Sequence, residues 1–173
     1  MIVLSSDQKG AIAETAAFLD ASRLGLEVFT PISAGGRCDF ILGIDDELVR
    51  VQCKWATRKG DVIVVRCYSS RRSATGFVRR SYSPREVDAL VAYCPELDRC
   101  YFLPMNEFGT RREIRLRLGP TRNKQRVGVH WASDYEFAAK LARPGAVAQL
   151  GERVAGSHEV RGSIPLGSID SAA

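Results

Sequence analysis

The segment from Arg37 to Lys54 constrains the fold most, because it reads as two β-strands joined by a tight turn. Residues 40–44 and 48–51 are mostly apolar, and two aspartates separate them. Side chains alternate along a strand, so Gln52 and Lys54 share a face, and a turn at residues 45–47 brings Asp39 opposite residues 52 and 53. A carboxylate, an amide oxygen and an ammonium group would then meet, which suits a hard cation and phosphate oxygens.

Length and cysteine content indicate one domain in a reducing compartment. The 173 residues are enough for one domain with a real core. Five cysteines without a Cys-x-x-Cys pair favour neither a disulfide framework nor a zinc site. We see no apolar run of bilayer length and no signal peptide, so we expect a cytoplasmic protein without a membrane partner.

The net charge of +5 is unevenly distributed. Asp61 is the only acid between Arg58 and Arg85, a range rich in Lys and Arg, and a second basic cluster follows from Arg111 to Arg126. Residues 71–82 read as a polar loop with interleaved aromatic residues, which suits contacts with phosphates and stacking on bases. The alternative is an ordinary solvated loop.

The chain begins with the order helix, strand, strand, strand, strand, which indicates an α+β fold with a mixed sheet flanked by helices. We predict a helix over residues 7–24, capped by Ser6 or Asp7 and ended by Gly25. Its expected apolar stripe contains Ala11, Ile12, Thr15, Ala16, Phe18 and Leu19. Glu14 lies mid-helix among small residues, which permits close approach to a neighbouring element, although a helical Glu is usually just exposed.

The later elements are predicted by turn and capping signals. Strands are expected at 26–30 and 62–68, the second either central or buried on both faces. Ser83, followed by Pro84 and Glu86, predicts a short helix. A hairpin at 90–94 and 100–103, a strand at 111–118, a polar loop at 119–125 and a last helix near Ser133 complete the expected domain, which spans residues 1–143.

Residues 144–173 differ in kind from the rest. Codons that fit residues 147–153 and 159–165 resemble the D-arm and the T-arm of a transfer RNA gene. We therefore expect a reading frame that runs into such a gene, and a tail that is disordered or loosely packed.

The order Glu14, Asp39, Gln52-x-Lys54 resembles the PD-(D/E)XK nuclease core, and in particular its group I intron-associated homing endonuclease branch. Further matching segments extend the resemblance over about residues 7–140, namely 9–14, 30–33, 51–54, 82–93, 101–104, 123–125 and 131–132. Cys38 replaces the proline before Asp39, and Gln52 replaces the second acidic residue. The intron-associated branch accepts Gln at that position.

The resemblance implies a restriction-endonuclease-like fold and the hydrolysis of DNA phosphodiesters with Mg²⁺ or Mn²⁺. Asp39, Gln52 and Glu14 would hold the ion, and Lys54 would position a water or neutralise charge in the transition state. Duplex DNA is the expected partner, no organic cofactor is expected, and a homodimer or homotetramer would match a palindromic target. The expected DNA-binding residues are Arg71, Arg72, Arg79, Arg80, Arg122, Asn123 and Gln125, the last two through base edges.

Two alternatives remain open at this point. A Holliday-junction resolvase or a restriction-type nuclease would use the same residues on the same core. A catalytically inactive module that only binds DNA would explain why Gln52 stands where a carboxylate is common.

Overall fold

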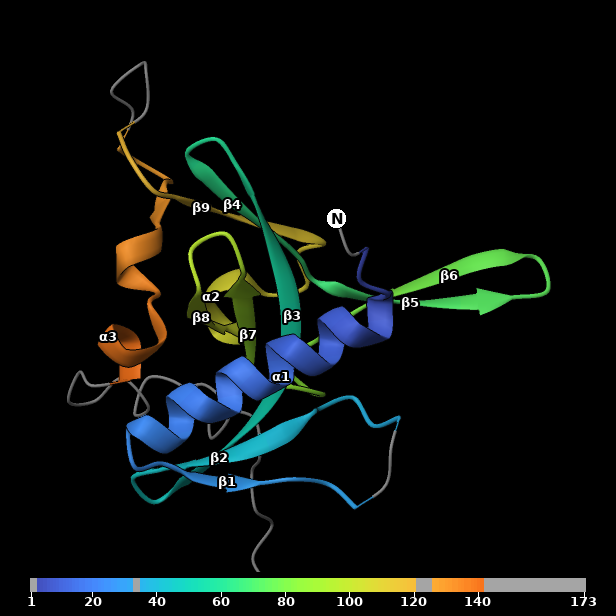
Figure 1. The fold of residues 1–173 in the computed structure, drawn as a ribbon, viewed down its shortest axis with the longest axis horizontal. Coiled ribbons are helices and arrows are strands. Elements are labelled where there is room, and N and C mark those ends of the chain that lie inside the picture. Colours follow the sequence, from blue (N-terminus) through green and yellow to red (C-terminus); the bar gives the residue numbers. More distant parts are fainter. Residues whose placement is uncertain (1–2, 33–34, 121–125, 142–173) are drawn as a thin grey trace, which may run out of the picture.

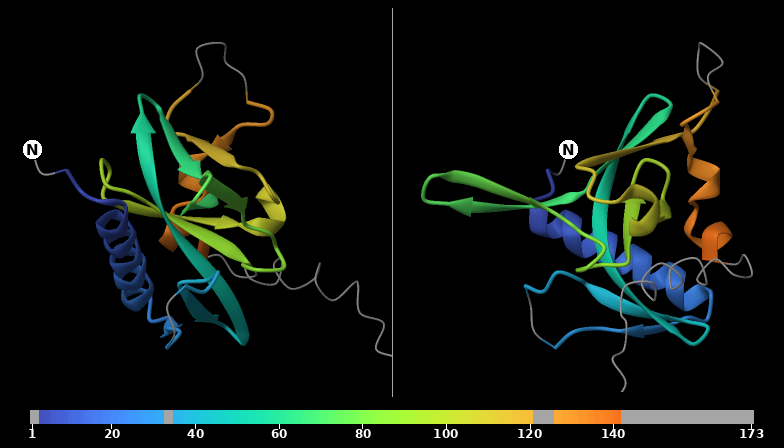
Figure 2. Two further views of the ribbon diagram at one scale, coloured as in Figure 1. Left: turned by 90° about the vertical axis from the view of Figure 1, so that its right-hand side faces the viewer. Right: turned by 180° about the vertical axis from the view of Figure 1, so that it is seen from behind.

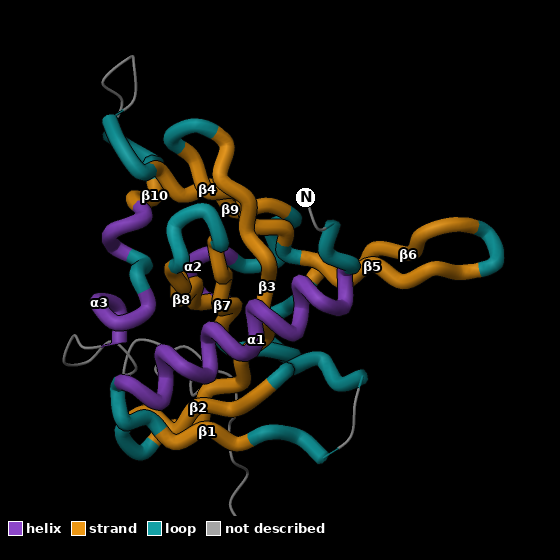
Figure 3. The backbone as a smooth tube through the Cα atoms, viewed as in Figure 1, coloured by secondary structure: helices purple, strands orange, loops and turns teal. Residues whose placement is uncertain are grey.

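The computed structural model describes residues 3–32, 35–120 and 126–141. Its centre is a mixed sheet in which β1, β2, β3, β4, β9 and β10 are neighbours in that order, while β7 pairs with β3 and β8 with β7 (Figure 1; β10 is labelled in Figure 3). These strands are β1 (Glu27–Phe29), β2 (Phe40–Ile44), β3 (Glu47–Lys59), β4 (Val62–Arg66), β7 (Ala89–Cys94), β8 (Arg99–Pro104), β9 (Glu113–Arg117) and β10 (His130–Trp131). The predicted α+β fold is confirmed. The expected tail from residue 144 lies outside the described residues.

Strand β3 organises the sheet because three other strands pair with it. It runs antiparallel to β2 along residues 47–51, antiparallel to β4 along 56–59 and parallel to β7 along 51–55. Between the end of the β2 pairing and the start of the β4 pairing, residues 52–55 have a strand partner only on the β7 side among the residues that the structure describes. One edge of β3 is therefore left without a described strand neighbour at residues 52–55, directly after the predicted hairpin. We call this edge the sheet opening.

Helix α1 (Ser6–Arg23) crosses the sheet and packs mainly on β3 and β7 (Figure 3). Ser5 caps it in a capping box with Gln8, so the predicted cap at Ser6 or Asp7 is wrong, and Gly25 follows its end with a φ of 71°. The predicted apolar stripe is wrong: the buried side chains are Ala13, Ala17 and Ala21, whereas Ile12, Phe18 and Leu19 are 37%, 46% and 47% exposed. Three small residues let the helix backbone approach the sheet closely, which a stripe of larger side chains would prevent.

The sequence predicted a loop at residues 71–82, and this prediction is wrong because two strands occupy most of the range. Strands β5 (Tyr68–Ser73) and β6 (Gly76–Ser81) form a separate two-stranded sheet that projects from the body as an arm (Figures 1 and 2). Gly76 has a φ of 125°, and the Ser73 hydroxyl donates to its carbonyl at 2.9 Å, which closes the turn. The polar composition hid this hairpin because none of its strand residues is fully buried.

The helix predicted at Ser83 is also wrong. Residues 83–86 form a single turn in which the amides of Glu86 and Val87 both donate to the Ser83 carbonyl. Val87 is fully buried, and the next amide, that of Asp88, donates to Arg50 on β3 at 2.9 Å, so the chain is drawn into β7. The hairpin β7–β8 and the strand β9 are confirmed.

The last predicted helix begins later than expected. A 3₁₀ turn at Ala132–Asp134 precedes α3 (Phe137–Leu141), and the short α2 (Met105–Phe108) follows β8. All five cysteines are free thiols. Within the described ranges, no helix is long and apolar enough to cross a bilayer.

Candidate active site

Asp39 fills the opening in the sheet beside β3. Its backbone amide donates to the Val51 carbonyl at 2.8 Å, which extends the β2–β3 pairing by one residue. Its carboxylate Oδ2 accepts a hydrogen bond from the Cys53 amide at 2.7 Å and another from the side-chain amide of Gln52. The carboxylate thus accepts the hydrogen bond of the Cys53 N–H, which a neighbouring strand would otherwise accept. The expectation that Asp39 lies opposite residues 52 and 53 is confirmed.

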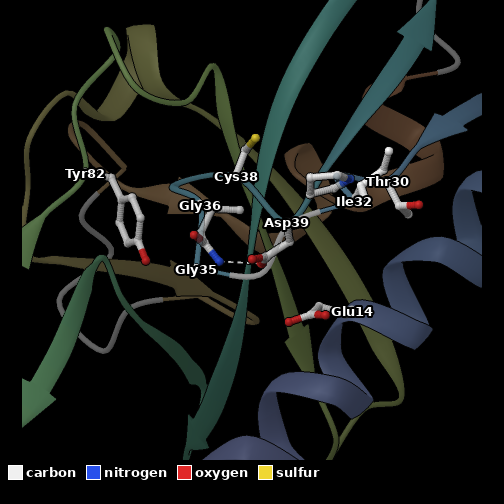
Figure 4. A pocket seen from close by; sticks show the side chains of 10 residues that line it. Glu14, Thr30, Ile32, Gly35, Gly36, Cys38, Asp39 and Tyr82 are labelled. Atoms are coloured by element: carbon white, nitrogen blue, oxygen red, sulfur yellow. Dashed lines mark hydrogen bonds between the residues drawn. The ribbon is translucent and has the colours of Figure 1, made fainter.

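A cavity of about 580 Å³ opens in front of this carboxylate. Glu14 reaches it from α1 and Gln52 from β3, while Tyr82 stands on the other side of Asp39 (Figure 4). The segment Thr30–Ile32 and Gly36 complete the wall. Residues from α1, β3 and the connection before β2 therefore meet at one cavity, although they are distant in sequence. Gln52 is only 8% exposed and is the one buried polar side chain in the part of the chain that the structure describes.

The pKa values of both carboxyl groups of the cavity are raised. Burial raises the pKa of Asp39, although the Cys53 amide, Lys54 and Gln52 oppose this shift. Burial also raises the pKa of Glu14, and the negative charge of Asp39 adds to the effect. Both groups therefore hold protons more tightly than free carboxyls do, and a cation between them would relieve the cost.

Lys54 is held at the site by a tyrosine. Its Nζ donates to the Tyr82 hydroxyl at 2.8 Å and lies 4.5 Å from the centre of the ring. Among the residues described, no carboxylate lies within ion-pair distance of this ammonium group. Tyr82 is 3% exposed, so its position is fixed by packing. The interaction keeps the positive charge near the cavity without neutralising the carboxylates.

Arg37 connects this tyrosine to the arm. Its guanidinium lies 4.1 Å from the centre of the Tyr82 ring and donates to the Ser69 hydroxyl of β5 at 2.9 Å. The same group pairs with Glu86 at 3.1 Å, and Glu86 also pairs with Arg80 on β6. The base of the arm is thus tied to the residue that supports Lys54. Tyr82, Arg37 and Glu86 were not predicted as site residues, although residues 82–93 were among the segments that resemble the family and aromatic and basic residues mix near position 82.

The predicted DNA-binding residues divide into two groups. Arg71 and Arg72 lie on β5, and Arg79 and Arg80 lie on β6. All four belong to the exposed arm, and cross-strand pairing places Arg72 and Arg79 on one face and Arg71 and Arg80 on the other. The other predicted residues (Arg122, Asn123 and Gln125) lie outside the described residues.

A family model for the PD-(D/E)XK endonuclease matches residues 4–138. This range contains α1, strand β3 and the predicted catalytic residues Glu14, Asp39, Gln52 and Lys54. The chain belongs to the PD-(D/E)XK endonuclease family.

One solved structure supports the assignment of this PD-(D/E)XK endonuclease. The structure of a bacterial homing endonuclease, I-Ssp6803I, is similar with a TM-score of 0.67 and 28% sequence identity. The similarity covers 84% of this chain and 98% of the other. A comparison with curated proteins gave no match.

The donor set of this PD-(D/E)XK endonuclease suits a hard divalent ion with few protein ligands. A closed metal site requires at least three His, Cys, Asp or Glu side chains close together, and the described ranges contain no such group. Mg²⁺ needs no such cage, since it keeps several waters and is held by one or two carboxylates plus substrate phosphates. Asp39 and Glu14 supply two carboxylates, whereas burial raises the pKa of the adjacent Cys53 thiol and keeps it from acting as a thiolate ligand.

Proposed function

We propose that the protein is an endonuclease that hydrolyses phosphodiester bonds of duplex DNA with Mg²⁺ or Mn²⁺, and that it acts as a group I intron-associated homing endonuclease. The observation that carries the proposal is the cavity where Glu14, Asp39 and Gln52 meet, with the Lys54 ammonium group held beside it by Tyr82. The similarity to a bacterial homing endonuclease supports the finer assignment.

Asp39 and Glu14 would hold the divalent ion, and Gln52 would add an amide oxygen. The Gln52 side-chain nitrogen now donates to Asp39, so its amide must rotate by half a turn to present the oxygen instead. When bound, the ion polarises the scissile phosphate and stabilises the leaving oxyanion. A site with two carboxylates and one amide carries less negative charge than a site with three carboxylates, which favours one ion over two.

Lys54 would act on the phosphate from the side of Tyr82. Its ammonium group donates to the tyrosine with one hydrogen and has two left for a phosphate oxygen and the attacking water. This arrangement orients the water for in-line attack and compensates the charge that develops on the phosphate. Tyr82 accepts from Lys54 and therefore positions the ammonium group.

The arm would supply the affinity for DNA. Four exposed arginines on a narrow two-stranded ribbon can contact phosphates on both sides of a groove, and B-DNA's major groove, about 12 Å wide, admits such a ribbon. Arg37 and Glu86 tie the base of the ribbon to the catalytic side chains, so DNA held by the arm is placed relative to the cavity.

A second subunit is part of the proposal. One cavity cuts one strand, so a double-strand break requires a homodimer, or a homotetramer, with two cavities on a palindromic site. Light scattering on the protein with its target duplex would give at least twice the chain mass, and a monomer in complex with DNA would contradict this. The free thiols suit a reducing cytoplasm as the place of action.

Cleavage of supercoiled plasmid tests the proposal. The substrate is a plasmid that carries the DNA flanking the gene's own insertion point, with the intron removed. We expect nicked and linear products with Mg²⁺, none with a chelator, and a loss of at least a hundredfold in rate in Lys54→Ala and Asp39→Asn. Plasmid that stays intact with the wild type, while it is bound, would instead support an inactive DNA-binding module. Equal cutting of four-way junctions and of the linear site would support a resolvase.

A further inference from the structure

A second cavity lies next to the first, and Lys54, which is not among the residues that line the first cavity, lines this one. Its volume is about 430 Å³, and it lies between the start of α1 and the surface of β3, β4 and β9. The basic side chains that line it are Lys9, Lys54, Lys59 and Arg66. Three of these have no role in the proposed catalytic site or among the predicted DNA-binding residues.

The charge of this cavity is strongly positive. Of the described residues that line it, Glu113 is the one acidic residue, and its carboxylate is already paired with Arg115 at 2.7 Å. Within the described ranges, Lys9, Lys59 and Arg66 form no ion pair with any carboxylate. Like charges this close repel each other, so the folded protein gains if an anion enters the cavity.

The cavity is built by the fold and is not a chance group of mobile lysines. Lys9 Nζ lies 5.9 Å from the centre of the Trp55 ring, which holds the lysine toward the sheet. Lys59 is the last residue of β3 and pairs with Val62, and Arg66 ends β4 opposite Glu113. The cations thus stand on a helix and on two paired strands.

The position of the cavity indicates which anion it takes. Lys9 and Glu14 are five residues apart on α1, or about 7.5 Å along the helix axis at 1.5 Å per residue. Successive phosphates of one DNA strand rise about 3.4 Å along the duplex axis. A strand whose scissile phosphate meets Asp39 and Lys54 would therefore present its next one or two phosphates to Lys9, Lys59 and Arg66.

We propose that this second cavity binds the backbone of the cleaved DNA strand, one or two phosphates from the bond that is cut. The inference rests on the proposed function, because it needs DNA in the active site. It adds a phosphate site between the start of α1 and the base of the arm, where Tyr68 of β5 also lines the cavity. Backbone contacts of this kind set register and carry no sequence information.

The salt dependence of DNA binding tests this site separately from catalysis. The variant Lys59→Ala/Arg66→Ala is compared with the wild type and with Arg23→Ala, a control in which an exposed basic residue at the other end of α1 is removed. Fluorescence anisotropy with a 30-base-pair duplex and Ca²⁺ gives the dissociation constant at several salt concentrations. Circular dichroism melting confirms that each variant is folded.

We expect the slope of log K against log salt to become shallower by about 1 to 2 in the double variant, since each lost phosphate contact removes about 0.9. The slope of Arg23→Ala should equal that of the wild type. A double variant with the wild-type slope would overturn the phosphate site while leaving the proposed nuclease intact. Failure of the wild type to bind or cut DNA would refute the proposed function itself.

Discussion

At the scale of single residues, Tyr82 keeps the ammonium group of Lys54 apart from the carboxylates of the site. Its hydroxyl accepts from Lys54 at 2.8 Å, while the carboxylates of Glu14 and Asp39 stay available for a cation. Tyr82→Phe keeps the ring and removes this acceptor. We predict that kcat for DNA cleavage falls about tenfold, as expected for a misplaced charge in the transition state, with DNA affinity within twofold of the wild type.

The matched control is Tyr93→Phe, which removes a hydroxyl that donates to Asp98 in a surface turn. Its cleavage rate should equal that of the wild type. If both variants cut at the wild-type rate, the positioning role of Tyr82 is refuted. If Tyr82→Phe weakens only DNA binding, the tyrosine serves the arm and not Lys54.

The raised pKa of Asp39 predicts that this residue, which the proposed metal site requires, lowers the stability of the folded protein at neutral pH. Burial makes the folded protein bind a proton at Asp39 more tightly than the unfolded chain does. The group therefore favours folding at pH values below its unfolded pKa, and this contribution is lost as pH rises through the higher folded pKa.

Asp39→Asn should consequently melt a few degrees higher than the wild type at pH 7 without metal, and the difference should disappear in acid. Thermal melting at several pH values measures this. Added Mg²⁺ should raise the melting temperature of the wild type and leave that of Asp39→Asn unchanged, because a ligand stabilises the state that binds it. A variant less stable than the wild type at neutral pH would show that the Asp39 hydrogen bonds outweigh its burial.

At the scale of elements, the arm is separable from the body. Among the described strands, β5 and β6 pair only with each other, and their base is fixed by Arg37. A two-stranded hairpin contributes little independent stability. Replacing residues 70–79 with an Asn-Gly turn should therefore leave the melting temperature within about 2 °C and reduce affinity for duplex DNA at least tenfold. Unchanged affinity would exclude the arm as a DNA-binding element.

Helix α1 holds Glu14 in place by a close approach to the sheet. Ala17 has no exposed surface. Ala17→Leu should destabilise the protein by about 1–3 kcal/mol, because a larger side chain forces the helix away from the sheet. Moving the helix also moves Glu14, so cleavage should fall as well. Ala11→Leu, on the exposed face of the same helix, is the control and should change neither. Denaturant unfolding and plasmid cleavage measure the two effects.

At the scale of the whole molecule, the contact between Asp39 and Gln52 was predicted from the sequence more accurately than the packing of α1 or the presence of the arm. The apolar runs of β2 and β3 and the turn between them predicted that Asp39 meets Gln52, because alternation and turn length leave little freedom. The burial of α1 through Ala13, Ala17 and Ala21 was missed, since small residues give weak periodicity. The β5–β6 arm was missed because its strands bury no face, and therefore show neither an apolar run nor the alternation of polarity that indicates a strand.

The turn at Ser83 shows a different limit. Ser83, Pro84 and Glu86 satisfy the local rules for a helix start, but Arg37 and Arg80 engage Glu86 from outside the segment. Tertiary contacts therefore overrode a correct local signal. The role of Tyr82 could not be read either, because its partners Lys54 and Arg37 are 28 and 45 positions away in sequence.

The central claim is that one divalent ion sits where the sheet opens beside β3. In the test, Fe²⁺ is added to the folded protein in place of Mg²⁺, and ascorbate with peroxide cuts the polypeptide close to any iron that is bound. The account predicts fragments, identified by mass spectrometry, that end near residues 14, 39 and 52–54, and their suppression by excess Mg²⁺ and by Asp39→Asn. Cuts that cluster elsewhere, or that persist in Asp39→Asn, would contradict it.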